Sequence, residues 1–390
     1  NKEDNRILNF GKLRFSAGIQ HTDYVPIQGL WLENYNGSAG SYLTGLGDGS
    51  WQWGTSLGYQ PTKHFNLETA YKFNWGADLR LFKQVDVNFD AYYQLRDDIL
   101  LSGDGLNSAV FGRPSAYVNW GRVASYGVEL GVNWVKQVDK DLSFNLGSNL
   151  TWGRNKQKRN IENVAYDYLS AIGGRVNQAW GLEVVGFFKD EADIAASPTQ
   201  NFSTVKPGDI KYRDVNGDNI IDANDKVAIG YSTTCPEIYY SLHLGAEWKG
   251  IGFYAMFQGT GNYSAVLDTK SMYWPLINNT NISQYAYDNR WTPQNQNAKF
   301  PRLSSQSNAN NYQTSTLWLA DRSFLKLRNL EVYYKLPASW LKKTKIVNAA
   351  KLYVRGIDLF SFDHIDENDP EAYGINPMTK SVALGLSVTF

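Results

Sequence analysis

The sequence predicts an all-β fold, an antiparallel transmembrane β-barrel in which short turns alternate with long loops. Three observations predict this fold. Apolar and polar residues alternate along about ten segments, aromatic residues bracket several of these segments, and the connections between them alternate in length. Alternation with a period of two residues indicates strands with one apolar face. Because a barrel strand needs only about 9–11 such residues to cross a membrane, the chain as a whole can stay polar.

The alternation keeps one parity within each segment. In residues 126–134, one face carries Tyr126, Val128, Leu130, Val132 and Trp134, and the other carries Glu129, Gly131 and Asn133. The final segment places Val382, Leu384, Leu386, Val388 and Phe390 opposite Ala383, Gly385, Ser387 and Thr389. Each strand therefore has an apolar face and a face of small or polar residues.

Aromatic residues stand at both ends of several strands. The pairs Tyr126/Trp134, Phe144/Trp152 and Tyr240/Trp248 each span eight residues. That separation is roughly 27 Å along a strand. For a strand tilted by about 40°, it is roughly 20 Å along the membrane normal, close to the ~25 Å apolar band between the aromatic girdles of membrane barrels. A soluble β-sandwich has no reason to repeat this arrangement.

The connections alternate between short and long. Short or moderate ones are 83–84, 136–140, 249–250 and 336–349, and long ones are 21–66, 98–125, 154–236, 261–322 and 361–380. Membrane barrels have short periplasmic turns and longer extracellular loops. Compact soluble domains rarely contain several loops beyond about 12–15 residues. The pattern therefore favours a membrane barrel, with 154–236 as a long extracellular loop.

Composition excludes several other classes. Lys plus Arg and Asp plus Glu both number 38, so the chain lacks the basic surface expected of a nucleic-acid-binding protein. It contains no apolar run long enough for a transmembrane helix. The single Cys235 cannot form an internal disulfide. The four histidines, His21, His64, His243 and His364, have no metal-binding or catalytic spacing, so we expect no enzyme activity.

The segments also suggest part of a larger barrel. Ten strands could close a small barrel whose interior is filled by side chains. Here the predicted inner faces carry glycine and short polar residues, which we expect to leave space for a wide lumen. No signal peptide opens the chain, so we interpret it as mature or incomplete at its N-terminus.

Several separated motifs resemble the C-terminal part of SusC/RagA-type TonB-dependent transporters, in the order found in that family. They are Asn119-Trp-Gly-Arg-Val-Ala-Ser-Tyr-Gly-Val-Glu-Leu130, Gly208-Asp-Ile-Lys-Tyr-Arg-Asp-Val-Asn-Gly-Asp218, Asn289-Arg-Trp-Thr-Pro293, Ser323-Phe-Leu-Lys-Leu-Arg-Asn329, Leu336-Pro337 and Asp369-Pro-Glu371. The resemblance runs from about Leu67 to Phe390. Several motifs in one order are more specific than any single motif.

This resemblance implies that residues 1–390 are the C-terminal part of a plugged barrel of about 22 strands, without the plug domain. It implies active import of an oligosaccharide or a peptide across the outer membrane of a Gram-negative bacterium. The implied partners are a SusD-like surface lipoprotein, TonB acting through the missing N-terminal region, and outer-membrane lipid.

One stretch follows the spacing of an EF-hand calcium loop. Oxygen-bearing residues stand at positions 1, 3, 5, 9 and 12, and position 7 would supply a backbone carbonyl. The predicted ligands are Asp214, Asn216, Asp218, Ile220, Asp222 and Asp225. Position 6 is Asn219 instead of Gly, and position 12 is Asp instead of Glu. The alternatives are a structural Ca²⁺ site and a polar turn without an ion.

Two further features bear on function. Aromatic residues of the long loops could stack on ligand, or they could pack the loops together: Trp180, Phe187, Phe188, Tyr273, Trp274 and Trp291. Phe390, at the end of an amphipathic strand, resembles the signal by which barrel-assembly machinery recognises its clients. The substrate-binding residues stay unknown at this stage.

Two other classes remain open. A calcium-dependent cell-surface binding or adhesion β protein is the main alternative to a transporter. A cell-surface hydrolase comes third, because the residues show no catalytic constellation.

Overall fold

In the computed structural model, the described residues are 7–390 except 26–27, 44–50, 271, 278–279, 307, 342–345 and 375. Ten long strands form one antiparallel sheet, which confirms the predicted fold class. They are β1 (Leu8–Thr22), β6 (Glu68–Leu81), β7 (Val85–Ser102), β8 (Tyr117–Gln137), β9 (Leu142–Arg159), β16 (Ile238–Trp248), β17 (Ile251–Gly261), β20 (Phe324–Lys335), β21 (Ala349–Ile357) and β23 (Ser381–Thr389).

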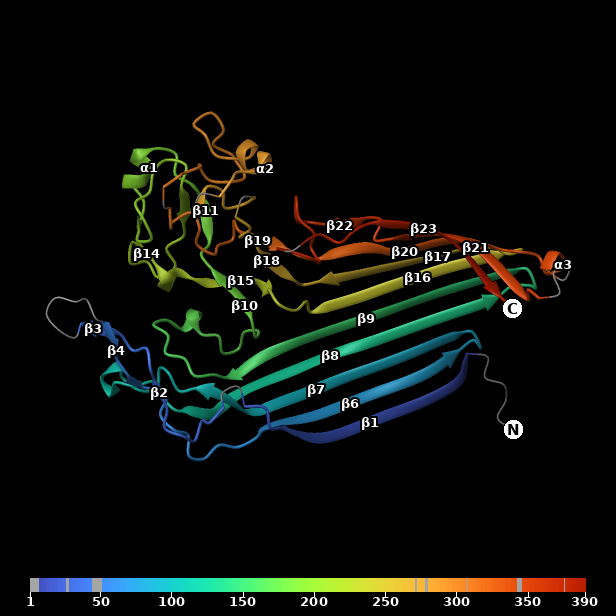
Figure 1. The fold of residues 1–390 in the computed structure, drawn as a ribbon, viewed down its shortest axis with the longest axis horizontal. Helices are drawn as coiled ribbons and strands as arrows, with labels where there is room; N and C mark the ends of the chain where they lie inside the picture. Colours follow the sequence, from blue (N-terminus) through green and yellow to red (C-terminus); the bar gives the residue numbers. More distant parts are fainter. Residues whose placement is uncertain are drawn as a thin grey trace.

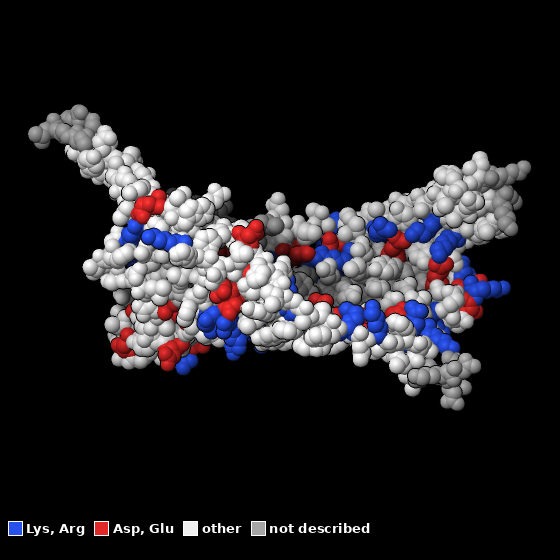
Figure 2. All heavy atoms as spheres, turned by 90° about the horizontal axis from the view of Figure 1, so that it is seen from below, with Lys and Arg blue, Asp and Glu red and all other residues white. Residues whose placement is uncertain are grey.

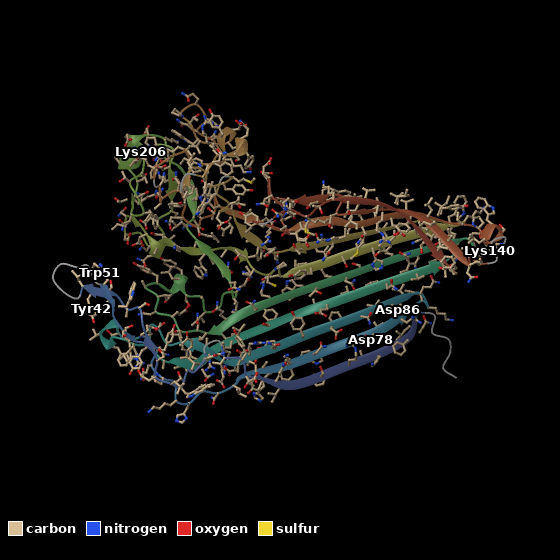
Figure 3. All side chains as sticks on the ribbon, viewed as in Figure 1. Tyr42, Trp51, Asp78, Asp86, Lys140 and Lys206 are labelled. Atoms are coloured by element: carbon tan, nitrogen blue, oxygen red, sulfur yellow. The ribbon has the colours of Figure 1, made fainter. Side chains whose placement is uncertain are left out.

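These strands pair in sequence order, from β1 at one edge to β23 at the other. Figure 1 shows them as one long curved sheet, with the long loops gathered at one end and the C-terminus at the other. Lys140, in the β8–β9 turn, lies near the C-terminal end, whereas Tyr42 and Trp51 lie at the loop end (Figure 3). Short and long connections therefore occupy opposite ends of the sheet, as predicted.

Shorter elements lie in the connections. The strands are β2 (Tyr35–Asn36), β3 (Ser41–Leu43), β4 (Trp51–Trp53), β5 (Ser56–Leu57), β10 (Gln178–Gly181), β11 (Val184–Phe187), β12 (Thr199–Gln200), β13 (Ile210–Tyr212), β14 (Ile220–Ile221), β15 (Val227–Ser232), β18 (Ser264–Val266), β19 (Leu319–Asp321) and β22 (Ser361–Asp363). The helices are α1 (Glu191–Ala195), α2 (Gln284–Asp288) and α3 (Ala338–Leu341), with 3₁₀ turns η1 (Ala109–Phe111), η2 (Asp167–Leu169) and η3 (Ala223–Asp225). No helix among the described residues is long and apolar enough to cross a membrane.

The strands extend further at the loop end than the sequence pattern indicated. β7 runs to Ser102, β8 begins at Tyr117 and β9 continues to Arg159, all within ranges expected to be loop. Residues 154–159 of β9 are all polar, and Ile99, Leu100 and Leu101 of β7 are consecutive apolar residues, so neither extension shows the apolar alternation that identifies a strand. Backbone pairing with the neighbouring strands continues beyond it, through irregularities in register at Arg96/Ile99 and Arg122/Val123.

One face of the sheet presents apolar side chains to the outside. Leu13 of β1 is 84% exposed, Val332 of β20 is 51% exposed and Leu384 of β23 is 74% exposed. The register places like faces together, since Leu130 lies opposite both Phe89 and Leu150. An exposed apolar surface that continues across a whole sheet marks a face that contacts lipid or protein rather than water.

Candidate functional site: the loop lobe and the inner wall

Three long loops, 160–237, 262–323 and 358–380, pack into one lobe with its own hydrophobic core. The core residues are Leu182, Ile210, Tyr212, Ile221, Ala265, Leu267, Tyr273, Phe300, Trp318 and Ile365. Trp318 is fully buried, and its ring stacks on Phe300 with centroids 5.7 Å apart. Burial raises the pKa of Tyr212, and it raises that of Tyr312 to about 12. The lobe therefore excludes water as the core of a small domain does.

Of the six loop aromatics that we expected either to stack on ligand or to pack the loops, five pack the loops, whereas Trp180 in β10 is half-buried and is not among the residues that pack on this core. Phe188, Tyr273 and Trp291 are buried. Phe187 and Trp274 are half-buried and pack against the same core. Their apolar area is used in holding the lobe together.

Asp209 joins two of these loops from a fully buried position. Its carboxylate accepts hydrogen bonds from Arg302 Nη2 at 3.0 Å, Asn308 Nδ2 at 2.9 Å and Asn311 Nδ2 at 2.8 Å. It also accepts one from the backbone N–H of Lys206 at 2.7 Å. Buried charge is tolerated only when it is paired and hydrogen-bonded in this way. Asp209 belongs to the 208–218 motif, but the sequence of this motif does not indicate which residues pair with Asp209.

The 208–218 and 289–293 motifs meet at Gly208. This residue has φ +89°, and a Cβ there would overlap the Trp291 ring. Only glycine combines this left-handed backbone with such a close approach. The Gly208 carbonyl accepts a hydrogen bond from Arg302 N at 2.9 Å. Two motifs that are far apart in sequence therefore pack directly against each other, and we call this contact a joint.

The 323–329 and 369–371 motifs form a second joint. Lys326 is 3% exposed, and its ammonium donates to Asp369 at 2.6 Å and to Glu371 at 3.3 Å. Arg328 bonds Glu371 at 2.5 Å and Asp358 at 2.8 Å. These ion pairs attach loop 358–380 to strand β20.

The predicted calcium loop is ordered by hydrogen bonds between its side chains and its own backbone. Asp214 accepts from Gly217 N at 2.6 Å and Asn219 N at 2.9 Å. Buried Asp225 accepts from Val215 N at 2.8 Å and Asp222 N at 2.9 Å, which closes the loop. Asn219 has φ +61°, the backbone that position 6 of such a loop requires.

The other predicted ligands also bond locally. Asn216, Asp218 and Asp222 accept the backbone N–H two residues further on, and Ile220 starts β14. Among the described residues, no three His, Cys, Asp or Glu side chains are gathered as a metal ion would require. The carboxylates would therefore have to turn toward a common point to bind calcium, and the site stays a prediction.

Part of the inner wall of the sheet is covered rather than open and glycine-lined as we expected, although Gly18 still faces open space. Inward-facing glycines one or two strands away are covered by the rings of Tyr92, His243, Tyr333 and Tyr353. The rings cover Gly127 and Gly153, Gly147, Gly252 and Gly385, respectively. The space that each glycine leaves is filled sideways by an aromatic ring, an arrangement that stabilises glycines in sheets.

Several charged groups on this wall are paired. Arg14 bonds both Asp78 at 3.0 Å and Asp90 at 2.8 Å across three strands. Lys351 and Arg355 of β21 bond Glu331 of β20. Figure 2 shows basic and acidic side chains interspersed rather than segregated. The wall is polar without a strong net charge.

Phe390 lies just beyond β23 and is 75% exposed, on the face that carries Val382, Leu384 and Leu386. Its place at the end of an apolar face agrees with the prediction. Its role as an assembly signal stays a prediction.

The comparisons with known proteins agree with this architecture. TonB-dependent receptor P26 of Formosa agariphila is 27% identical, covering 98% of this chain and 40% of the relative. TonB-dependent receptor SusC of Bacteroides thetaiotaomicron is 23% identical, covering 100% and 38%. The solved RagAB peptide transporter superposes with a TM-score of 0.73 at 21% identity, covering 100% of this chain and 42% of that chain. No family model matches.

The fold is thus the one found in part of a TonB-dependent transporter barrel. Within that class, the resemblance to the C-terminal part of SusC/RagA-type transporters, predicted from the motifs, is confirmed along the whole chain. The chain spans about two fifths of the length of the relatives it matches.

Proposed function

We propose that this chain forms part of an outer-membrane importer of oligomeric nutrient, an oligosaccharide or a peptide, energised through TonB. The carrying observation is the two-sided sheet. Its outer face exposes apolar residues from β1 to β23, its inner face is polar with several ion pairs, and a packed lobe stands at one end. A sheet of this kind suits a wall between lipid and a polar passage. The named relatives, TonB-dependent receptors, support the energy source.

Uptake by cells that carry the full-length transporter tests this function. Fluorescently labelled oligosaccharides and peptides are supplied to cells with and without TonB, and periplasmic label is measured. We expect accumulation of one class only when TonB is present. Label that stays on the cell surface and depends on calcium would instead support the adhesion alternative. Cleavage of the probes by purified protein would support a hydrolase.

We also infer that a SusD-like lipoprotein covers the loop end of the barrel. Support comes from exposed aromatic residues in the connection between β1 and β6, which lies at that end (Figure 3). Trp31, Tyr35, Tyr42, Trp51 and Trp53 are each more than half exposed. Solvent-exposed aromatic groups of this size usually mark an interface. Replacing Trp51 and Trp53 with Ser should lower co-purification of the lipoprotein, whereas replacing exposed Trp340 near the opposite end should not.

We further propose that residues 214–225 bind a structural calcium ion. The left-handed Asn219 and the closure by Asp225 support a loop of the right shape. Asp214, Asn216, Asp218, Asp222 and Asp225 would supply side-chain oxygens, and Ile220 its carbonyl. Calorimetry of the full-length transporter with Ca²⁺ should show binding that is lost in Asp214→Ala. Heat uptake indistinguishable between the two proteins would refute the site.

Phe390 is proposed as the assembly signal. Phe390→Asp places a charge on a surface that faces lipid, and it should lower the amount of transporter in the outer membrane. Ser387→Asp, on the inner face of the same strand, is the matched control. Equal membrane levels of Phe390→Asp and wild-type protein would contradict the proposal.

A further inference from the structure

We propose that a pocket at the loop end of the inner wall binds one acidic sugar unit, a uronic acid residue, of the imported oligomer. This inference rests on the proposed import function and names a substrate class for it. The pocket lies where loop 160–237 meets strands β7, β8 and β9 and leads into β16. We call it the rim pocket. Its lining includes Tyr92, Ser125, Thr151, Arg154, Arg175 and Tyr239.

The size of the rim pocket fits a single unit rather than a whole oligomer. Its volume is about 240 Å³. Sites for drug-sized ligands measure roughly 300–1,000 Å³. A polymer passing along the wall could therefore insert one ring or one side chain at this point.

The charge of the rim pocket is set by two arginines around one carboxylate. Glu237 is 6% exposed and accepts hydrogen bonds from Arg154 Nε and Nη2, both at 2.8 Å, and from Arg175 Nε at 2.5 Å. Asn262 Nδ2 donates to it as well, at 3.0 Å. Two guanidinium groups facing one carboxylate leave a local excess of one positive charge. An anionic group of the ligand would balance it.

The arginines also retain donors after binding Glu237. Each guanidinium carries five N–H donors. Arg154 uses two of its nitrogens on Glu237, and Arg175 uses Nε on Glu237 and Nη1 on Gln178. Among the described residues, Arg154 Nη1 and Arg175 Nη2 have no hydrogen-bond partner. Glu237 therefore fixes both side chains in place, so that a ligand carboxylate would meet donors already oriented for it.

The remaining lining groups favour a sugar over an acidic peptide. Ser125, Thr151, Asn155 and Ser232 offer hydroxyl and amide groups, and Tyr92 and Tyr239 add aromatic rings. Such groups pair with the hydroxyls and the C–H faces of a sugar ring. One recurring mode of peptide binding adds the peptide as a strand to a free sheet edge. The strands here offer none, because β7, β8 and β9 are each paired on both sides.

Binding by the purified full-length transporter tests the rim pocket without TonB. The probes are a galacturonic acid trimer, its fully methyl-esterified form and an acidic tripeptide, compared by calorimetry. We expect the trimer to bind at least tenfold more tightly than its ester. Arg175→Gln should remove that preference, and Arg213→Gln, in an exposed ion pair on the same loop, should keep it. Preferential binding of the tripeptide, or equal binding of trimer and ester, would overturn the proposal.

Cys235 supplies a readout that needs no variant, because it lines the rim pocket and is exposed. The acidic trimer should slow alkylation of Cys235 by iodoacetamide severalfold, and the ester should not. This measurement stays decisive if Arg175→Gln fails to fold. Equal alkylation rates with both trimers would refute the site. TonB-dependent uptake of neutral oligomers in cells would then leave the import function standing while the rim pocket is rejected.

Discussion

Asp209→Asn should loosen the loop lobe while leaving the sheet intact. The substitution keeps the shape of the side chain but removes the negative charge and turns one acceptor into a donor. Arg302 then loses its counterion. The new amide nitrogen faces donors whichever way it turns, either the side chains of Asn308 and Asn311 at the Oδ1 place or Lys206 N and Arg302 Nη2 at the Oδ2 place. Removing one partner of a buried ion pair typically costs about 3–5 kcal/mol. The Arg302 side chain is 22% exposed, so water relieves part of this cost. We therefore expect about 3 kcal/mol.

Hydrogen–deuterium exchange of the full-length transporter measures this effect directly. Since each 1.4 kcal/mol is a factor of ten, amides that exchange by opening of the lobe should exchange roughly 100-fold faster. Amides of β8 and β9 should keep their wild-type rates. Asp288→Asn is the control, because this exposed carboxylate has one side-chain partner, Gln284. Unchanged protection of residues 206–212 in Asp209→Asn would refute the view that this carboxylate joins the loops.

Two more predictions concern the inner wall and the loop joint. Gly252→Ala should displace the Tyr333 ring and destabilise the barrel by about 1–3 kcal/mol, measured by heat-modifiability gels. Gly18→Ala should not destabilise it, because a Cβ at this position meets open space. Equal melting temperatures of the two variants would contradict the covering role of the ring. Burial disfavours ionisation of Asp369 and Glu371, but hydrogen bonds from Lys326 and Arg328 outweigh it and hold both pKa values below the ordinary 3.8 and 4.5. The ionised carboxylates therefore stabilise the attachment of the loop fully above the ordinary pKa values, and this stabilisation is lost as the pH falls through the lowered pKa values. Pepsin should cut loop 358–380 only in that acidic range. Cleavage that does not vary with pH would count against the joint.

The barrel strands could be predicted because their pattern is local. A strand between lipid and a polar lumen must alternate apolar and polar residues. The two faces of Tyr126–Trp134 can therefore be assigned from this segment alone. The strand extensions around Arg122 and Arg159 could not be found in this way. Residues 154–159 are polar on both faces, and a register irregularity at Arg122/Val123 interrupts the pattern of β8, so backbone pairing alone identifies the strands there.

The lobe contacts could not be predicted, because they join residues that are far apart in the chain. Asp209 and Asn311, or Lys326 and Asp369, carry no local sign of their pairing. The inner-wall glycines show the same limit. Their small size suggested open space, but the ring of Tyr353 that covers Gly385 comes from the neighbouring strand. For the residues of the two joints, the one signal in the sequence was that they belong to family-like motifs.

The joints also explain why the substrate was hidden in the sequence. Gly208, Trp291, Lys326 and Glu371 all stand in motifs that resemble a transporter family, and the structure commits each of them to internal packing or ion pairing. Groups engaged in this way cannot also contact a ligand without opening the lobe. The residues left to choose a substrate are therefore those that the joints do not engage, and Arg175 at the rim pocket is one of them. A family resemblance that rests on residues of the joints predicts the fold. The residues that determine substrate specificity have to be sought outside the joints.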